Sequence, residues 1–224
     1  MIAAQHEILQ KPYGTSWITY TRCHDDIGLG YDDYMIEHAG FNPFQHRKFL
    51  QEFYSGHHPG SRRGARFSRI NPKTNDARIS GSLASLCGLE SALKKQRRRG
   101  RSTVRRPDRH DAGAQLSARR DSHALYGDEA AYTNDYSYLD DPAKSYDNRW
   151  MHRPMVNWKE RPDRAGGGPE GKVYAATRKL IAIRNKLPMI ADNKNLTSAH
   201  AAQHSRGRLP ANARKPARLL SLQL

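Results

Sequence analysis

Apolar residues gather in a few segments separated by turn residues, and their spacing predicts both strands and helices. A run rich in β-branched and aromatic residues, SWITYTRC at 16–23, predicts a buried strand. Apolar residues on one face of HRKFLQEFY at 46–54 predict a helix, and leucines three and four residues apart predict another over 83–93. A last helix is predicted within KVYAATRKLIAIRNKL, which is followed by Pro188.

The pattern changes abruptly at two places and divides the chain into four zones. Residues 1–95 and 126–196 carry aromatic and apolar residues between turn signals, which is typical of folded structure. Residues 96–125 have no sustained apolar period and almost no large hydrophobic residue, which predicts disorder. Residues 197–224 return to this basic, aperiodic character.

The positive charge is concentrated in the two aperiodic zones. The chain has 38 Lys and Arg against 22 Asp and Glu, a net charge of +16. Residues 97–125 hold nine Arg against three Asp, and residues 197–224 hold four Arg and one Lys without an acid. Basic stretches of this kind are typical of nucleic-acid-binding proteins, which makes that class one alternative.

Other features of the composition predict which compartment and cofactors to expect. No apolar run approaches the roughly 18 residues of a membrane-spanning helix, and the first ten residues do not look like a signal peptide. We therefore expect no membrane partner and a cytoplasmic location. The two cysteines, Cys23 and Cys87, lie far apart without a CxxC spacing. This predicts neither a disulfide framework nor a zinc site, and we expect no metal and no cofactor.

Candidate chemistry lies where the predicted strand at 16–23 ends, at His24, Asp25 and Asp26. In parallel α/β folds, ligand-binding groups gather at the carboxyl ends of strands. A carboxylate there can accept hydrogen bonds from neighbouring sugar hydroxyls, and such bonds tighten as positive charge develops during glycosyl transfer. The triplet therefore suggests a sugar-binding site. The alternative is a solvated acidic turn without a ligand.

A second candidate group surrounds Arg149 in the segment DDPAKSYDNRWMHRP. Its neighbours include Asp147, Trp150, His152 and Arg153. An arginine fork beside aromatic residues can form the floor of a sugar pocket when it pairs with a carboxylate. The alternative is a surface network of ion pairs.

Several long segments resemble, in order and approximate spacing, the carboxyl-terminal part of the catalytic domain of amylosucrase. They are YTRCHDDIGLGYDD, HRKFLQEFYSG, INPKTNDARISGSLASLCGLE, YGDEAAYTNDYSYLDDPAKSYDNRWMHRP and the last predicted helix. Amylosucrases are glucosyltransferases of the α-amylase superfamily. The resemblance covers residues 1–95 and 126–196, and its motifs are long enough to be specific.

The resemblance implies an α/β fold, a partial (β/α)8 TIM barrel in which 16–23 is the seventh strand and YGDE follows the eighth. It also implies the chemistry of carbohydrate metabolism: sucrose is cleaved with retention through a covalent glucosyl-enzyme, glucose passes to an α-1,4-glucan, and fructose is released. Sucrose and α-glucan are thus the implied partners. Both the nucleophile and the acid/base of the family lie on earlier strands, outside this chain, so we expect this chain to be inactive alone.

The resemblance also assigns roles to single residues. Asp25 matches the aspartate that stabilises the transition state, and His24 matches the adjacent sugar-contacting histidine. Asp26, Arg47 and Arg78 match positions that line the acceptor subsites. Arg149 matches the arginine that closes the bottom of the glucose pocket, and its implied partner aspartate lies outside this chain.

The basic zones depart from the family, and codon arithmetic suggests a frameshift in each. Codons permitted for residues 111–125, read one base later, can spell a hydrophobic strand ending GGIPMLY. Those for residues 201–210 can spell PHNIHVAGYL, similar to the family's carboxyl-terminal β-domain. We interpret residues 96–125 and the tail from 197 as out of frame. Such a peptide needs no specific nucleic-acid partner, although a basic nucleic-acid-binding protein stays an alternative, as does a sucrose hydrolase or isomerase of the same superfamily.

Overall fold

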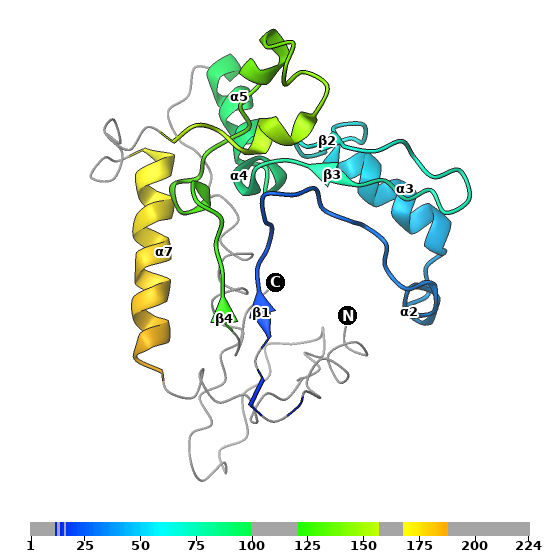
Figure 1. Cartoon of the computed structure of the whole chain (residues 1–224), viewed down its shortest axis with the longest axis horizontal. Helices are drawn as coiled ribbons and strands as arrows, with labels where there is room; N and C mark the ends of the chain where they lie inside the picture. Colours follow the sequence, from blue (N-terminus) through cyan, green and yellow to red (C-terminus); the bar gives the residue numbers. More distant parts are fainter. Residues whose placement is uncertain (1–11, 13, 16, 100–120, 157–167, 188–224) are drawn as a thin grey trace.

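The computed structural model describes residues 12, 14, 15, 17–99, 121–156 and 168–187 (Figure 1). Most of the zone 96–125 and the whole tail from 197 lie outside the described residues. The strands are β1 (Ile18–Thr19), β2 (Ala65–Arg66), β3 (Ile79–Ser80) and β4 (Asp121–Ser122). The α-helices are α2 (Asp33–His38), α3 (Pro43–Tyr54), α4 (Leu83–Leu86), α5 (Leu89–Arg99) and α7 (Pro169–Asn185). Three short 3-10 helices are η1 (Asp128–Ala130), η2 (Ser137–Asp140) and η3 (Asn148–His152).

The predicted helix over 46–54 is confirmed as α3, which begins three residues earlier at Pro43. Asn42 caps it, because its side-chain oxygen accepts a hydrogen bond from the Gln45 backbone N–H at 3.0 Å. Proline suits the first helical position, where its missing N–H is not needed. The last predicted helix is also confirmed, as α7.

The segment predicted as one helix over 83–93 forms two helices, α4 and α5. The break falls at Gly88, whose φ of +93° suits glycine and not a side-chain-bearing residue. The guanidinium of Arg62 occupies the place where a Cβ at this position would lie. The backbone of α5 then runs to Arg99, beyond the predicted boundary at 95.

The predicted strand at 16–23 is present only as β1, and the prediction that it is buried is wrong. β1 pairs in parallel with β4, with Ile18 opposite Asp121, and Figure 1 shows the two strands side by side, with α7 on the β4 side. Ile18 is 60% exposed, and Trp17 and Tyr20 beside the strand are also exposed. A strand of a parallel sheet is buried only when neighbours cover its faces, and the described residues give β1 one paired strand.

The apolar core consists of two small clusters on either side of α4. Leu29, Ile79 and Leu86 form one cluster, against which Leu50 and Tyr54 pack. Ala84, Leu89 and Ala131 form the other, which is closed by Leu93 and Val173. Buried polar side chains lie close to these clusters and hydrogen-bond to one another, as in the chain from Ser82 through Ser85 to Glu90. Hydrogen bonds between buried polar side chains therefore stabilise this part of the fold together with the two apolar clusters.

Candidate functional site

Residues 24–26 form a turn that the structure places against η3 and the residue that follows it. The turn begins five residues after the end of β1, so it does not follow the strand directly. The pairing of β3 with β2, and an isolated bridge between Ile27 and Ile79, hold the chain immediately after the turn. Here Asp25 of the turn contacts Arg149, which lies in η3.

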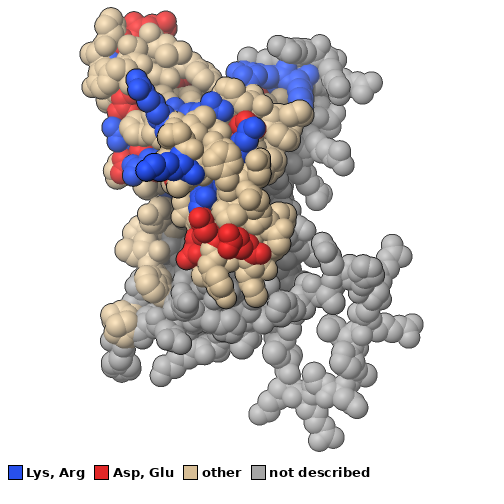
Figure 2. Space-filling view, turned by 90° about the vertical axis from the view of Figure 1, so that its right-hand side faces the viewer, with Lys and Arg blue, Asp and Glu red and all other residues tan. Residues whose placement is uncertain are grey.

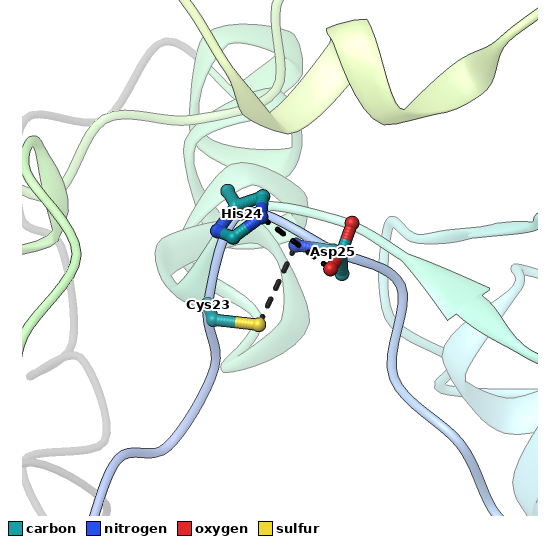
Figure 3. Close-up of side chains that lie close together, drawn as sticks. All are labelled: Cys23, His24 and Asp25. Carbon is teal, nitrogen blue, oxygen red and sulfur yellow. Dashed lines mark hydrogen bonds and ion pairs between the residues drawn. The ribbon is translucent and has the colours of Figure 1, made fainter.

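Asp25 is a half-exposed carboxylate that faces two guanidinium groups. Its Oδ1 atom lies 3.5 Å from Nη1 of Arg149 and 3.3 Å from Nη2 of Arg153. Its Oδ2 atom lies 3.4 Å from Nε2 of His24, whose side chain is mostly exposed. Figure 3 shows the two side chains at the top of the turn. The site thus presents a carboxylate, an imidazole and two arginines to solvent within one small area.

Arg149 is held in place by a residue of its own loop. Its Nε and Nη2 atoms donate to the carboxylate of Asp147, with a shortest distance of 2.7 Å from Nη2 to Oδ2. The guanidinium also lies over the ring of Phe67, 4.6 Å from its centroid. The hydrogen bond from Arg149 lowers the pKa of Asp147, and the same bond raises the pKa of Arg149. The resemblance implied a partner aspartate outside the chain; among the described residues, Arg149 forms its shortest ion pair with Asp147.

Asp26 and Arg78, two of the predicted acceptor residues, form a pair of very different exposure. Oδ2 of Asp26 lies 3.2 Å from Nη1 of Arg78, and the Asp26 side chain is almost completely buried while that of Arg78 is 62% exposed. Asp26 therefore anchors Arg78, and the guanidinium of Arg78 stays open to a ligand.

Arg47 is placed differently from what the resemblance implies for an acceptor subsite. It is buried, and its guanidinium bonds to the carboxylate of Asp33 and to the backbone carbonyls of Tyr31 and Thr74. These contacts order the loop that precedes α2. Since its donors already have protein partners, Arg47 supports the loop and offers little surface to a sugar.

His152 and Arg153, which the sequence placed in the candidate group around Arg149, hold the turn in place. Arg153 donates from Nε to the carbonyl oxygen of His24 at 2.6 Å. His152 is fully buried; its Nδ1 accepts from the Gly81 N–H at 3.0 Å, and its Nε2 lies 2.9 Å from the same His24 carbonyl. Because Nδ1 accepts, Nε2 carries the proton and donates. The neutral ring therefore joins the turn to the end of β3.

Lowering the pH is expected to destabilise the fold through His152. Burial lowers the pKa of His152 from 6.5 to about 4. The hydrogen bond to the His24 carbonyl favours the charged form and raises the pKa, but its effect is smaller than that of burial. Between these values the unfolded chain binds more protons, so stability is full above pH 6.5 and is lost as the pH falls towards 4. We expect the free energy of unfolding to drop by about 2 kcal/mol between pH 7 and pH 5 from this residue alone. Urea unfolding at the two pH values measures the drop.

A non-titrating variant separates His152 from the other groups. His152→Gln should be less stable at pH 7 but lose much less stability on acidification than the parent chain. His38→Gln changes an exposed histidine of α2 and serves as the matched control, with the parent's pH dependence. An unchanged pH dependence in the His152 variant would contradict the assignment.

A buried ion pair lies directly beneath the turn. The Nη2 and Nε atoms of Arg22 donate to Oδ1 of Asp128 at 2.8 and 3.0 Å, and both side chains are less than a tenth exposed. Nη1 of Arg22 also lies 3.4 Å from the Cys23 carbonyl and 3.5 Å from that of His152. Burial raises the pKa of Asp128, and the opposing charge of Arg22 works against this rise. The pair thus connects the segment after β1 with η1 and η3.

Cys23, His24 and Asp25 each offer one metal-ligand atom within 4.8 Å of the others (Figure 3). The Cys23 sulfur accepts a weak contact from the Asp25 N–H at 3.5 Å. Arg149 and Arg153 both face Asp25, so a cation bound by this carboxylate would lie beside two positive charges. Coulomb repulsion at these distances opposes a metal, and we assign the Asp25 carboxylate to its two ion pairs.

No family model matches the chain. Among the described residues, none of the helices has both the length and the apolar character needed to cross a membrane.

Proposed function

We propose that the 24–26 turn, together with Arg149 and Arg153, binds a glucosyl unit of sucrose or an α-glucan, as the resemblance to amylosucrase implies. The observation that carries this proposal is the contact of Asp25 with both arginines. These residues are far apart in the sequence, and the resemblance assigned Asp25 and Arg149 to one glucose pocket. A half-exposed carboxylate beside guanidinium groups supplies both acceptors and donors for neighbouring sugar hydroxyls.

A partial (β/α)8 barrel as the parent fold is proposed from the resemblance alone. The parallel pairing of β1 with β4 agrees in direction with such a barrel, but β4 lies inside residues 96–125, which the frameshift interpretation treats as out of frame. Parallel strands need a crossover connection, usually one that includes a helix, and α5 ends before the described residues resume at β4. In such a fold the binding residues lie beyond the carboxyl ends of the strands. The 24–26 turn comes after β1 in the chain, separated from it by residues 20–23.

We expect the chain alone to bind the glucosyl unit without cleaving sucrose. A retaining enzyme needs two carboxyl groups about 5–5.5 Å apart, one as nucleophile and one as acid/base. The resemblance places both of these carboxyl groups outside this chain. Asp128 is another carboxylate near the turn, but it forms an ion pair with Arg22. The measurement is a fructose assay after incubation of the purified chain with sucrose, and the expected result is no fructose above a blank. Fructose release that disappears in Asp25→Asn would overturn the expectation.

The frameshift interpretation has a separate test in the DNA that encodes the chain. Translation in all three forward frames should give amylosucrase-like sequence one base out of frame across residues 96–125 and after 196. Those frames would then read as an eighth strand and a β-domain. Stop codons or unrelated sequence in these frames would contradict the interpretation and would favour the basic nucleic-acid-binding alternative.

A further inference from the structure

A basic hollow lies on the part of the molecule formed by the loop after α3 and the middle of α5. Its volume is about 330 Å³. It is lined by four basic side chains, two serines and two glycines: Arg62, Arg63, Lys94, Lys95, Ser61, Ser91, Gly56 and Gly60. Figure 2 shows one face of the molecule, on which Lys and Arg side chains lie among Asp and Glu side chains in the upper part and a further acidic group lies below them. Among the described residues, no acidic residue lines the hollow.

Internal contacts neutralise only a small part of this charge. Lys94 forms an ion pair with Glu90 at 2.7 Å, and Arg62 lies over the ring of Phe53 at 5.2 Å, a contact that leaves its charge uncompensated. Within the described ranges, no acidic side chain lies in ion-pair distance of Arg63 or Lys95. The hollow therefore keeps a net charge of several units, and like charges held this close together favour an anion between them.

The remaining lining groups are suited to an oxyanion. Hydroxyl groups of Ser61 and Ser91 can donate hydrogen bonds, and Gly56 and Gly60 allow a ligand to approach the backbone closely because they have no side chain. Arginine and lysine form strong charge-assisted hydrogen bonds with phosphate oxygens. In the part of the chain that the structure describes, no aromatic ring lines the hollow, so these residues offer a nucleic-acid base no stacking surface.

We propose that this hollow binds a small molecule that carries several phosphate charges, such as a phosphate ester or a short polyphosphate. A concave site with convergent cations suits a discrete ligand, whereas a nucleic-acid strand needs an extended basic track with stacking platforms. The site uses none of the residues of the sugar site, so it stands independently of the proposed glucosyl binding.

The test is calorimetric titration of the full chain with sodium tripolyphosphate at neutral pH and fixed salt concentration. The variant Arg63→Gln with Lys95→Gln removes two exposed, unpaired charges from the hollow. Its affinity for tripolyphosphate should fall about ten-fold or more, because hydrogen bonds to charged groups are lost. The matched control, Arg105→Gln with Arg106→Gln, removes the same charge from the basic zone 97–125 and should change the affinity less than about two-fold. Circular dichroism verifies that both variants keep the parent's helix content.

Three results would overturn the proposal. One is the absence of measurable tripolyphosphate binding by the parent chain. Another is an equal loss of affinity in the two double variants, which would mean that total charge and not the hollow attracts the anion. The third is tighter binding of an oligothymidine, weakened in the same way by the hollow variant, which would make this surface part of a nucleic-acid interface.

Discussion

Asp128→Asn is expected to lower the free energy of unfolding by about 3–5 kcal/mol, because it leaves the charge of Arg22 buried without its partner. The Arg22 side chain is only 3% exposed, and both of its bonds to the carboxylate are at most 3.0 Å long. Asparagine has nearly the same shape but no charge. The loss therefore comes from electrostatics and hydrogen bonding and not from packing. Since Arg22 also contacts the carbonyls of Cys23 and His152, the 24–26 turn should lose its order together with the pair.

Urea unfolding followed by tryptophan fluorescence measures this loss. The matched control is Asp141→Asn, which breaks an exposed ion pair with Lys144 at 2.9 Å in the same part of the chain. Exposed pairs contribute little to stability, so the control should be close to the parent chain. Similar losses in the two variants would mean that burial of the Arg22 pair is not what makes it important.

The local parts of the fold could be predicted from the sequence. Helix α3 depends on an apolar face and on the cap Asn42–Pro43, all of which are close together in the chain. The break at Gly88, before α5, could not be predicted from the spacing of the leucines. It depends on the backbone conformation of Gly88 and on the guanidinium of Arg62, which packs against this glycine from outside the segment. For β1 the composition correctly indicated extended structure, but burial depends on which strands lie beside it, and local sequence does not encode that.

The candidate site was predictable as far as the resemblance reached. It assigned sugar-binding roles to Asp25 and Arg149, which stay predictions, and in the structure Oδ1 of Asp25 lies 3.5 Å from Nη1 of Arg149. It did not indicate Asp147, although the two-residue spacing to Arg149 could have suggested a local pair. His152 and Arg153 were named in the candidate group around Arg149, but their contacts with the turn were not predicted, because their partners are backbone atoms more than a hundred residues away. Hydrogen bonds to backbone atoms leave no pattern in the side-chain sequence.

Asp25→Asn is expected to weaken sugar binding about a hundred-fold or more, since a carboxylate that accepts two hydroxyl hydrogen bonds loses charge-assisted contacts worth roughly 1.5–3 kcal/mol each. The substitution also removes the negative charge that Arg149 and Arg153 face. Arg153 keeps its bond to the His24 carbonyl, so the turn should stay in place. The expected effect is therefore on binding and not on the fold.

The most direct test of the proposed function is equilibrium binding of maltotriose to the full chain, measured by ligand-observed nuclear magnetic resonance. We expect saturable binding by the parent chain and by Asp141→Asn, and binding too weak to detect in Asp25→Asn and in Arg149→Met. Equal binding by the parent and Asp25→Asn, or no binding by a folded parent chain, would contradict the assignment of the 24–26 turn as a glucosyl site.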